Sequence, residues 1–226
     1  MHLNDSHKKQ VYLIPGLGAS SRIFEYLKFT GNSDIHFLEW ISPLHAKEDI
    51  ASYAQRMAKF ISGENIILIG VSFGGVIAQE IARFRDVDKI ILISSIKSSK
   101  ELPRRLKYIK YSKLYYLAPL LAYIKFDSGR LRVPGKLLKR KVYLYARYMH
   151  TKDKMYLLWA TRQMLYWKEQ ESEIPLIHIH GSKDQIFPVQ HLSDFIEIKD
   201  GSHAMILTQA RKISKIINKI LCENDH

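Results

Sequence analysis

Residues Asn65 to Val76 read NIILIGVSFGGV, and this stretch decides how the rest of the chain is interpreted. A run of Ile and Leu, typical of a buried strand, ends at Gly70, and a helical pattern begins after Gly74. Ser72 lies between these glycines in the pattern G-x-S-x-G, which predicts a strand, a sharp turn bearing the serine, and a helix. Backbone and helix pack too closely there for neighbouring side chains, which explains the glycines. An ordinary glycine–serine turn has the same local pattern. Whether Ser72 is a nucleophile or only a turn residue therefore depends on candidate partner residues elsewhere in the chain.

The two flanks of the chain alternate strand and helix patterns around this turn. Runs such as IILIG and IILIS are apolar on both faces, as expected of parallel strands covered by helices on each side. We therefore predict an α/β fold with a parallel, doubly wound sheet of about six strands and helices on both faces. The predicted strands are 10–15, 34–40, 65–70, 88–95, 174–180 and 194–199, and the predicted helices are 23–29, 47–61, 75–84 and 209–221, with a further helical turn at 188–193.

Residues 97–170 interrupt this alternation and hold all of the excess positive charge. They contain 19 Lys or Arg against four acidic residues, a balance of +15, whereas the rest of the chain has 16 basic and 18 acidic residues. A chain of 226 residues is long enough for one well-buried domain. We therefore predict a core formed by 1–96 and 171–226, with 97–170 as a basic helical insertion.

Apolar positions inside the insertion recur at helical spacing. They are Tyr108, Tyr111, Leu114, Tyr115, Leu117, Ala118 and Leu121, and Lys107, Lys110 and Lys113 line another side. A solvated lysine face over a packed aromatic face is one interpretation. The other is a surface that docks something acidic: a carrier protein bearing an acyl chain, an anionic membrane or an anionic small molecule. Nucleic acid fits the charge alone, and no recognised nucleic-acid motif supports it.

The composition also bears on the compartment. The first ten residues, MHLNDSHKKQ, are polar and lack the apolar region of a signal peptide, and no apolar run approaches membrane-spanning length. A single cysteine, Cys222, excludes an internal disulfide framework. We therefore expect a cytoplasmic protein without a transmembrane segment.

A serine nucleophile needs a base that takes its proton and a carboxylate that orients the base. Asp184 and His203 are the candidates, because each follows a predicted strand, as Ser72 does, and loops at the carboxyl ends of parallel strands meet. Taken singly, Asp184 could be a turn aspartate and His203 a polar loop residue. The loop 94–97 offers no competing acid. Only 19 positions separate Asp184 from His203, which leaves little room for a helix before the last strand.

Two amides are expected to receive the negative charge that develops when the serine attacks a carbonyl group. One belongs to Phe73, the residue after the nucleophile, and the other to Leu17 in the glycine-flanked loop after the first strand. Pro15 precedes this loop, and no HGGG sequence is present in it.

Four segments carry a family resemblance. VYLIPGLGAS (11–20), GVSFGG (70–75), HIHGSKDQIFP (178–188) and DGSHAMI (200–206) resemble the corresponding segments of α/β-hydrolase-fold enzymes, and the basic insertion resembles the helical lid of that family. The order Ser, Asp, His is also the order in that family. The sequence departs from the family pattern at Pro15, where many members have histidine. The resemblance implies a serine hydrolase that cleaves a carboxylic ester or thioester and needs no cofactor.

The resemblance leaves other functions open. The same site supports lyase or acyl-transfer chemistry, and a non-enzymatic binding module on the same fold would use the basic lid alone. In charge layout and length, the chain is also similar to the acyl-carrier-protein methyl-ester esterases of biotin synthesis, whose basic lid meets an acidic carrier.

Two further patterns suggest other sites, and we set both aside. His178 and His180 form an H-x-H near Asp184, which suggests a metal, but no further cluster of ligands is evident. Gly16-Leu17-Gly18 with Glu39 imitates a dinucleotide fingerprint, but Ser21 occupies the third glycine position.

Overall fold

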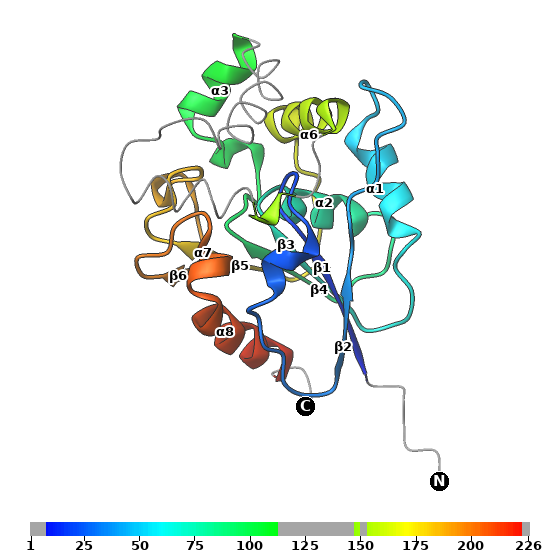
Figure 1. Cartoon of the computed structure of the whole chain (residues 1–226), viewed down its shortest axis with the longest axis vertical. Coiled ribbons are helices and arrows are strands. Elements are labelled where there is room, and N and C mark those ends of the chain that lie inside the picture. The colour runs from blue at the N-terminus through cyan, green and yellow to red at the C-terminus, as the bar shows by residue number, and fades with distance from the viewer. Residues whose placement is uncertain (1–7, 113–146, 150–152, 223–226) are drawn as a thin grey trace.

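The computed structural model describes residues 8–112, 147–149 and 153–222. Its centre is a sheet of six parallel strands, as predicted, in the order β2-β1-β3-β4-β5-β6 (Figure 1). The strands are β1 (Lys9–Ile14), β2 (Ser33–Phe37), β3 (Ile66–Val71), β4 (Lys89–Ile93), β5 (Leu176–Gly181) and β6 (Ile196–Ile198).

The strand order reverses next to β1. The chain passes from β1 to β2 at one edge and then returns to add β3 on the other side of β1. In open α/β sheets, ligands bind outside the carboxyl ends of the strands at such a switch point. Ile14 pairs with Gly70, which aligns the ends of β1 and β3. The loop after β1 and Ser72 therefore leave the sheet side by side at the switch point.

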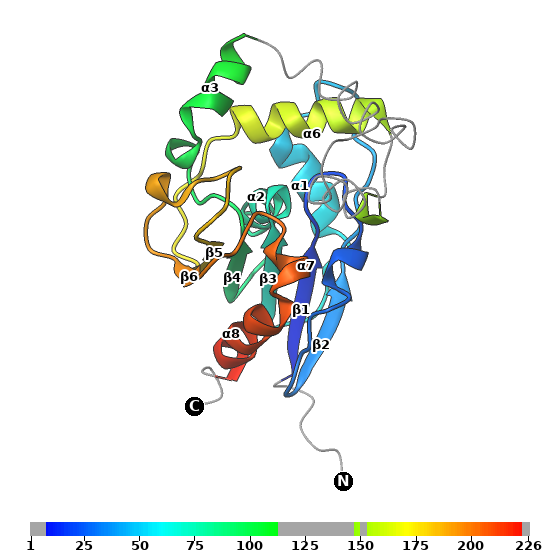
Figure 2. The same cartoon turned by 60° about the vertical axis from the view of Figure 1, so that its left-hand side comes forward.

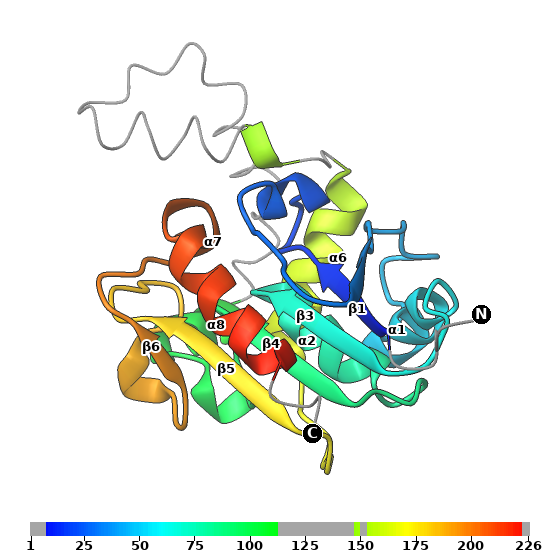
Figure 3. The same cartoon turned by 90° about the horizontal axis from the view of Figure 1, so that it is seen from below.

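Helices cover both faces of the sheet, because strand residues point alternately to the two sides. On β3, Leu68 belongs to one apolar cluster with α1 (Ile50–Ala58) and α2 (Phe73–Ile81), whereas Ile67 and Ile69 belong to another with α8 (Ala210–Cys222). Figure 3 shows α8 on one side of the sheet and α1 and α2 on the other. The doubly wound arrangement is confirmed.

Several predicted bounds differ from the observed ones. The helix predicted over 47–61 begins only at Ile50, because the Asp49 carboxylate caps it by accepting a hydrogen bond of 2.8 Å from the Ser52 amide. Other differences include a strand that ends at Phe37 rather than at residue 40 and a short helix, α7 (Met205–Thr208), that was not predicted. A 3₁₀ helix at Ser21–Phe24 replaces the helix over 23–29, the last strand has three residues, and a 3₁₀ helix at Val189–His191 lies at the predicted turn.

The described part of the basic segment contains α3 (Arg104–Tyr111) and α6 (Lys154–Tyr166). No residue of α3 is buried, whereas α6 packs on the core. Both helices lie beyond the carboxyl ends of the strands (Figure 2). The predicted apolar and lysine positions from 113 to 121 lie outside the described residues. Among the helices that the structure describes, none is long and apolar enough to cross a membrane.

A carboxylate joins the two ends of this segment. Glu169 accepts hydrogen bonds from Ser98 Oγ at 2.6 Å and from the Ser99 amide at 2.7 Å. Burial alone would raise the pKa of Glu169, but these hydrogen bonds outweigh it and lower the pKa to about 2. The carboxylate is therefore charged near neutral pH and holds the start and the end of the segment together.

Candidate active site

Ser72 occupies the strained turn that the sequence predicts between β3 and α2. Its φ of 52° and ψ of −119° form a combination that residues with a side chain rarely adopt. A Cβ on Gly70 would lie 2.4 Å from the Gly74 carbonyl oxygen, and a Cβ on Gly74 would lie 2.3 Å from the Ile14 carbonyl oxygen. Both glycines of the motif are therefore required by contacts with the backbone.

Neighbouring groups hold this strained turn in place. The Ser72 amide donates to the Ile93 carbonyl at 2.9 Å, which continues the pairing with β4 beyond the strand. The Ser72 carbonyl accepts hydrogen bonds from Ser95 Oγ at 2.6 Å and from the Gly75 amide at 2.9 Å. With its backbone fixed on both sides, Ser72 has only its side chain free to rotate.

The structure brings together the three residues that the sequence analysis singled out. His203 Nε2 lies 3.0 Å from Ser72 Oγ, and His203 Nδ1 lies 2.8 Å from Asp184 Oδ2. The side chain of His203 is 21% exposed, whereas that of Asp184 is fully buried. The imidazole therefore joins the hydroxyl of a half-buried serine to a buried carboxylate.

Asp184 is held as a carboxylate. Its Oδ1 accepts hydrogen bonds from the main-chain amides of Ile186 at 2.7 Å and Phe187 at 3.0 Å. Burial alone would raise the pKa of Asp184, but hydrogen bonds from His180 and His203 outweigh it and hold the pKa well below its usual range. An ionised Asp184 accepts a hydrogen bond from the N–H at His203 Nδ1, which leaves Nε2 as the basic nitrogen facing Ser72.

The turns after β5 and β6 lie in contact, so the 19 positions between Asp184 and His203 are enough to bring the two side chains together. The Lys183 amide donates to the Gly201 carbonyl at 2.8 Å. A Cβ on Gly181 would lie 2.3 Å from the same carbonyl oxygen, so the turn after β5 touches the turn after β6. This contact, rather than an intervening α-helix, positions the two side chains.

His178 and His180 form a buried pair behind Asp184. His180 Nε2 lies 2.9 Å from the Phe187 carbonyl oxygen and 3.3 Å from Asp184 Oδ2, and His180 Nδ1 lies 3.0 Å from His178 Nε2. Since the Phe187 carbonyl can only accept, it assigns a proton to His180 Nε2. Sequence reasoning considered the H-x-H only as metal ligands. A polar residue at the end of a buried strand, four positions before a candidate acid, was the signal for this contact.

The loop after β1 lies against Ser72. A Cβ on Gly16 would lie 3.7 Å from Ser72 Cβ. Trp40, which the sequence analysis did not single out, donates from Nε1 to the Gly16 carbonyl at 3.1 Å and stacks on Phe73 with ring centroids 5.6 Å apart. Phe73 is the first residue of α2, where main-chain amides have no partner within the helix. Leu17, the other predicted amide donor, is half-buried and packs against the apolar cluster that contains Phe73.

The basic segment covers the same loop. A Cβ on Gly18 would lie 2.9 Å from Met149 Cε and 3.2 Å from Leu157 Cδ2, and Ala19 forms an isolated antiparallel bridge with Met149. The Ser20 amide donates to the Tyr148 carbonyl at 3.1 Å. Apolar side chains of the segment thus lie directly on the loop beside Ser72.

Comparisons with known proteins agree with this architecture. Residues 11–215 match a family model described as "Alpha/beta hydrolase family". A comparison with curated protein sequences gave no match. A lipase-esterase related protein from Clostridium acetobutylicum is 16% identical, with a TM-score of 0.64 over 97% of each chain.

Two further solved structures show the range of activities among similar folds. A thermophilic esterase from Thermogutta terrifontis is 17% identical, with a TM-score of 0.61 over 95% of this chain and 90% of that chain. A bromoperoxidase from Bacillus anthracis is 16% identical, with a TM-score of 0.62 over 96% of this chain and 92% of that chain. Identities this low show a shared fold and leave the substrate open. The family model, which spans most of the sequence, shows that this chain belongs to the alpha/beta hydrolase family.

Proposed function

We propose that this protein is a serine hydrolase that cleaves a carboxylic ester or thioester through an acyl-enzyme. The observation that carries the proposal is the line of hydrogen bonds from Ser72 Oγ through His203 to Asp184, at the switch point of the sheet. A strained serine, an imidazole with a fixed orientation and a buried carboxylate are the three groups that this chemistry needs.

The reaction follows from the positions of these groups. His203 Nε2 takes the proton of Ser72 Oγ as the oxygen attacks the substrate carbonyl carbon. The bond to the leaving alcohol or thiol then breaks, and the leaving group takes that proton from His203. His203 then takes a proton from water as the water oxygen attacks the acyl-enzyme, the bond between the acyl carbon and Ser72 Oγ breaks, and Ser72 Oγ takes that proton from His203 as the acid is released.

The negative charge on the carbonyl oxygen is the largest electrostatic demand of this reaction. The amides of Phe73 and Leu17 are proposed to receive it, because Phe73 begins α2 and Leu17 follows Gly16, which lies against Ser72. One preorganised donor of this kind typically contributes about 3 kcal/mol to lowering the barrier. Trp40 holds the loop that carries Leu17 through its hydrogen bond to Gly16.

We further propose that the acyl group is presented by an acidic partner. The support is α3, which has Arg104, Arg105, Lys107 and Lys110 within eight residues, no acid and no buried side chain. Tyr108 and Tyr111, which the sequence analysis placed on an apolar face, are 68% and 77% exposed. A basic, tyrosine-bearing helix with no buried residue is suited to contact a partner of opposite charge.

A fluorophosphonate probe tests the nucleophile. The wild-type protein should be labelled, and Ser72→Ala should lose the label together with about 10⁴-fold or more of kcat/KM on a p-nitrophenyl ester. Ser172→Ala is the matched control, since Ser172 is exposed and outside the site, and it should label normally. Labelling that persists in Ser72→Ala, or an unlabelled wild-type protein, contradicts the proposal.

Product analysis separates hydrolysis from the other chemistries of this fold. A hydrolase releases the free acid from the ester whether or not an acceptor alcohol or amine is added. An acyltransferase would form the transfer product at the expense of the acid, and a lyase would release neither. A non-enzymatic binding module would still bind its partner after the substitution Ser72→Ala.

A further inference from the structure

Tyr156, on α6, is a buried tyrosine whose hydroxyl has no partner. The residue is 2% exposed, and its Oη makes no hydrogen bond with any of the residues that the structure describes. Burial raises the pKa of the phenol well above its ordinary value, so the oxygen keeps its proton near neutral pH. The group is therefore a hydrogen-bond donor without an acceptor.

Other buried polar groups around Tyr156 are satisfied. Tyr53 donates to the Ile41 carbonyl at 2.8 Å, and Trp159 Nε1, on the same helix as Tyr156, donates to the Glu48 carbonyl at 2.8 Å. Burying a hydroxyl without a partner costs about 1–3 kcal/mol. A phenylalanine would fill the same ring space without this cost, so the hydroxyl needs an explanation.

The surroundings of Tyr156 place it against the loop beside Ser72. Its ring lies 5.7 Å from the ring of Trp40, the residue that holds Gly16, and Leu157 contacts Gly18. Tyr156 and Phe73 belong to one apolar cluster, and Leu17 packs against the same cluster. The unpartnered hydroxyl of Tyr156 is therefore buried in the cluster that borders the loop carrying the Leu17 amide.

We propose that Tyr156 Oη–H donates a hydrogen bond to the substrate carbonyl oxygen as negative charge develops on it. Tyr156 would then be a side-chain donor in addition to the amides of Leu17 and Phe73. This inference rests on the proposed esterase function and adds a catalytic residue from the basic segment. It explains why α6 carries a phenol at this buried position.

The substitution Tyr156→Phe tests the proposal, because it removes the hydroxyl and keeps the ring. We expect kcat on a p-nitrophenyl ester to fall about tenfold or more with little change in KM, since the donor acts on charge that exists mainly in the transition state. The melting temperature should stay equal or rise, because no folded-state hydrogen bond is lost. An unchanged kcat, or a change in KM alone, overturns the proposal.

A transition-state analogue gives a second readout. A trifluoromethyl ketone forms a tetrahedral adduct with the serine that bears the same oxyanion, so its inhibition constant should rise in Tyr156→Phe by about the factor lost in kcat. The matched control is Tyr53→Phe, which removes a partnered hydroxyl from the same apolar cluster and should lower the melting temperature but leave kcat near the wild-type value. An inhibition constant that is equal in wild type and Tyr156→Phe contradicts the proposed contact.

Failure of this inference is distinguishable from failure of the proposed function. A wild-type protein without fluorophosphonate labelling contradicts the esterase proposal, and the proposed role of Tyr156 with it. A labelled, active wild-type protein and a Tyr156→Phe variant with the same kcat contradict only the role of Tyr156.

Discussion

Two histidine side chains, His203 and His180, contact the same carboxylate oxygen of Asp184. His203 Nδ1 lies 2.8 Å and His180 Nε2 lies 3.3 Å from Asp184 Oδ2. Only His203 reaches Ser72, so His180 acts through the carboxylate. A carboxylate that accepts hydrogen bonds from two imidazoles and two main-chain amides is held in one orientation, and these hydrogen bonds lower its pKa.

We predict that His180→Phe impairs activity through Asp184. Loss of the His180 hydrogen bond removes one cause of the lowered pKa of Asp184, so that pKa rises towards its ordinary value. Asp184 then becomes protonated at a higher pH than in the wild-type protein, so at low pH a second protonation step, below that of the base His203, lowers kcat/KM at a higher pH than in the wild-type protein. At neutral pH we expect kcat to fall about tenfold through loss of orientation.

His180→Asn is the control for this prediction, because its amide keeps one donor near the carboxylate. It should restore part of the activity and shift the second, low-pH protonation step less than His180→Phe. If both variants lose activity equally with no shift of that step, His180 has a packing role alone.

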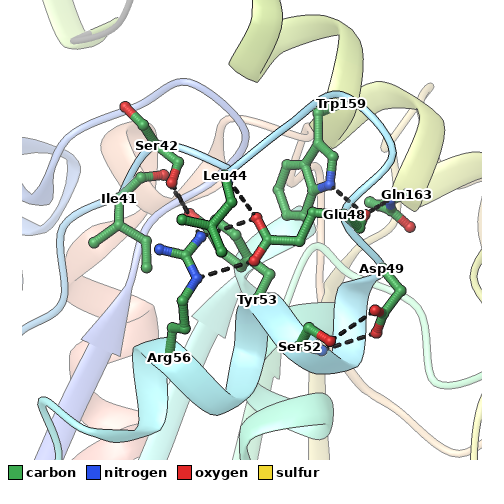
Figure 4. A network of polar contacts seen from close by, with 10 residues as sticks. All are labelled: Ile41, Ser42, Leu44, Glu48, Asp49, Ser52, Tyr53, Arg56, Trp159 and Gln163. Atoms are coloured by element: carbon green, nitrogen blue, oxygen red, sulfur yellow. Dashed lines mark hydrogen bonds and ion pairs between the residues drawn. The ribbon is translucent and has the colours of Figure 1, made fainter.

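At the scale of elements, α6 is anchored to the loop before α1 by one residue. The Glu48 carbonyl accepts Trp159 Nε1 and Gln163 Nε2, each at 2.8 Å (Figure 4). The Glu48 carboxylate, which is almost fully buried, is itself held by two hydrogen bonds of 2.9 Å from Arg56 and by the Leu44 amide at 2.7 Å. Glu48 therefore ties α1 and α6 together and fixes the helix that carries Tyr156.

Glu48→Gln should destabilise this junction. The substitution removes the charge that pairs with Arg56, whose side chain is 27% exposed, so part of the cost is relieved by water. We expect the free energy of unfolding, measured by urea denaturation, to fall by about 2 kcal/mol. Asp34→Asn is the matched control, because Asp34 pairs with Lys8 at a site where both side chains are more than a third exposed. The control should change stability by less than about 1 kcal/mol, and equal effects of the two substitutions would contradict a special role for Glu48.

The elements show what local pattern can and cannot predict. The central strands β3 and β4 follow from apolar runs such as IILIG, because burial on both faces leaves a direct mark on composition. The prediction of a helix over 23–29 was wrong, because apolar residues follow helical spacing there over less than two turns. In the structure the Lys28 amide donates to Ser214 Oγ of α8 at 2.9 Å instead of continuing a helix. A tertiary partner that lies 186 positions away leaves no local signal.

The same contrast holds for the candidate site as a whole. Ser72, Asp184 and His203 could be predicted, because each follows a strand and parallel strands bring such positions to one edge. Trp40 and Tyr156 could not, since their roles depend on which side of the Gly16–Gly18 loop each ring packs against. Strand order and side-chain packing are properties of the assembled molecule, and spacing in the sequence does not encode them.

The molecule as a whole separates its charge by region. The basic segment carries +15, and the remainder carries −2. The described part of that segment lies beyond the carboxyl ends of the strands, on the side of the sheet edge where Ser72 lies (Figure 2). A partner drawn to the positive charge would therefore approach the molecule from the side of the proposed nucleophile.

The last prediction tests whether this charge serves catalysis. With an acyl group carried on an acidic carrier protein, kcat/KM should fall steeply as NaCl is raised from 20 to about 500 mM, because salt screens the attraction between exposed charges. With a neutral p-nitrophenyl ester, kcat/KM should stay nearly flat as the salt concentration rises.

The double substitution Arg104→Glu and Lys107→Glu on α3 should weaken turnover of the carrier-borne substrate about tenfold at low salt and leave turnover of the neutral ester unchanged. The matched control is Lys212→Glu with Lys215→Glu on α8, which makes the same change in net charge on a helix that lies against one face of the sheet. If both double variants weaken carrier turnover equally, only net charge matters and α3 is not the docking surface, and a flat salt profile with the carrier removes the acidic partner altogether.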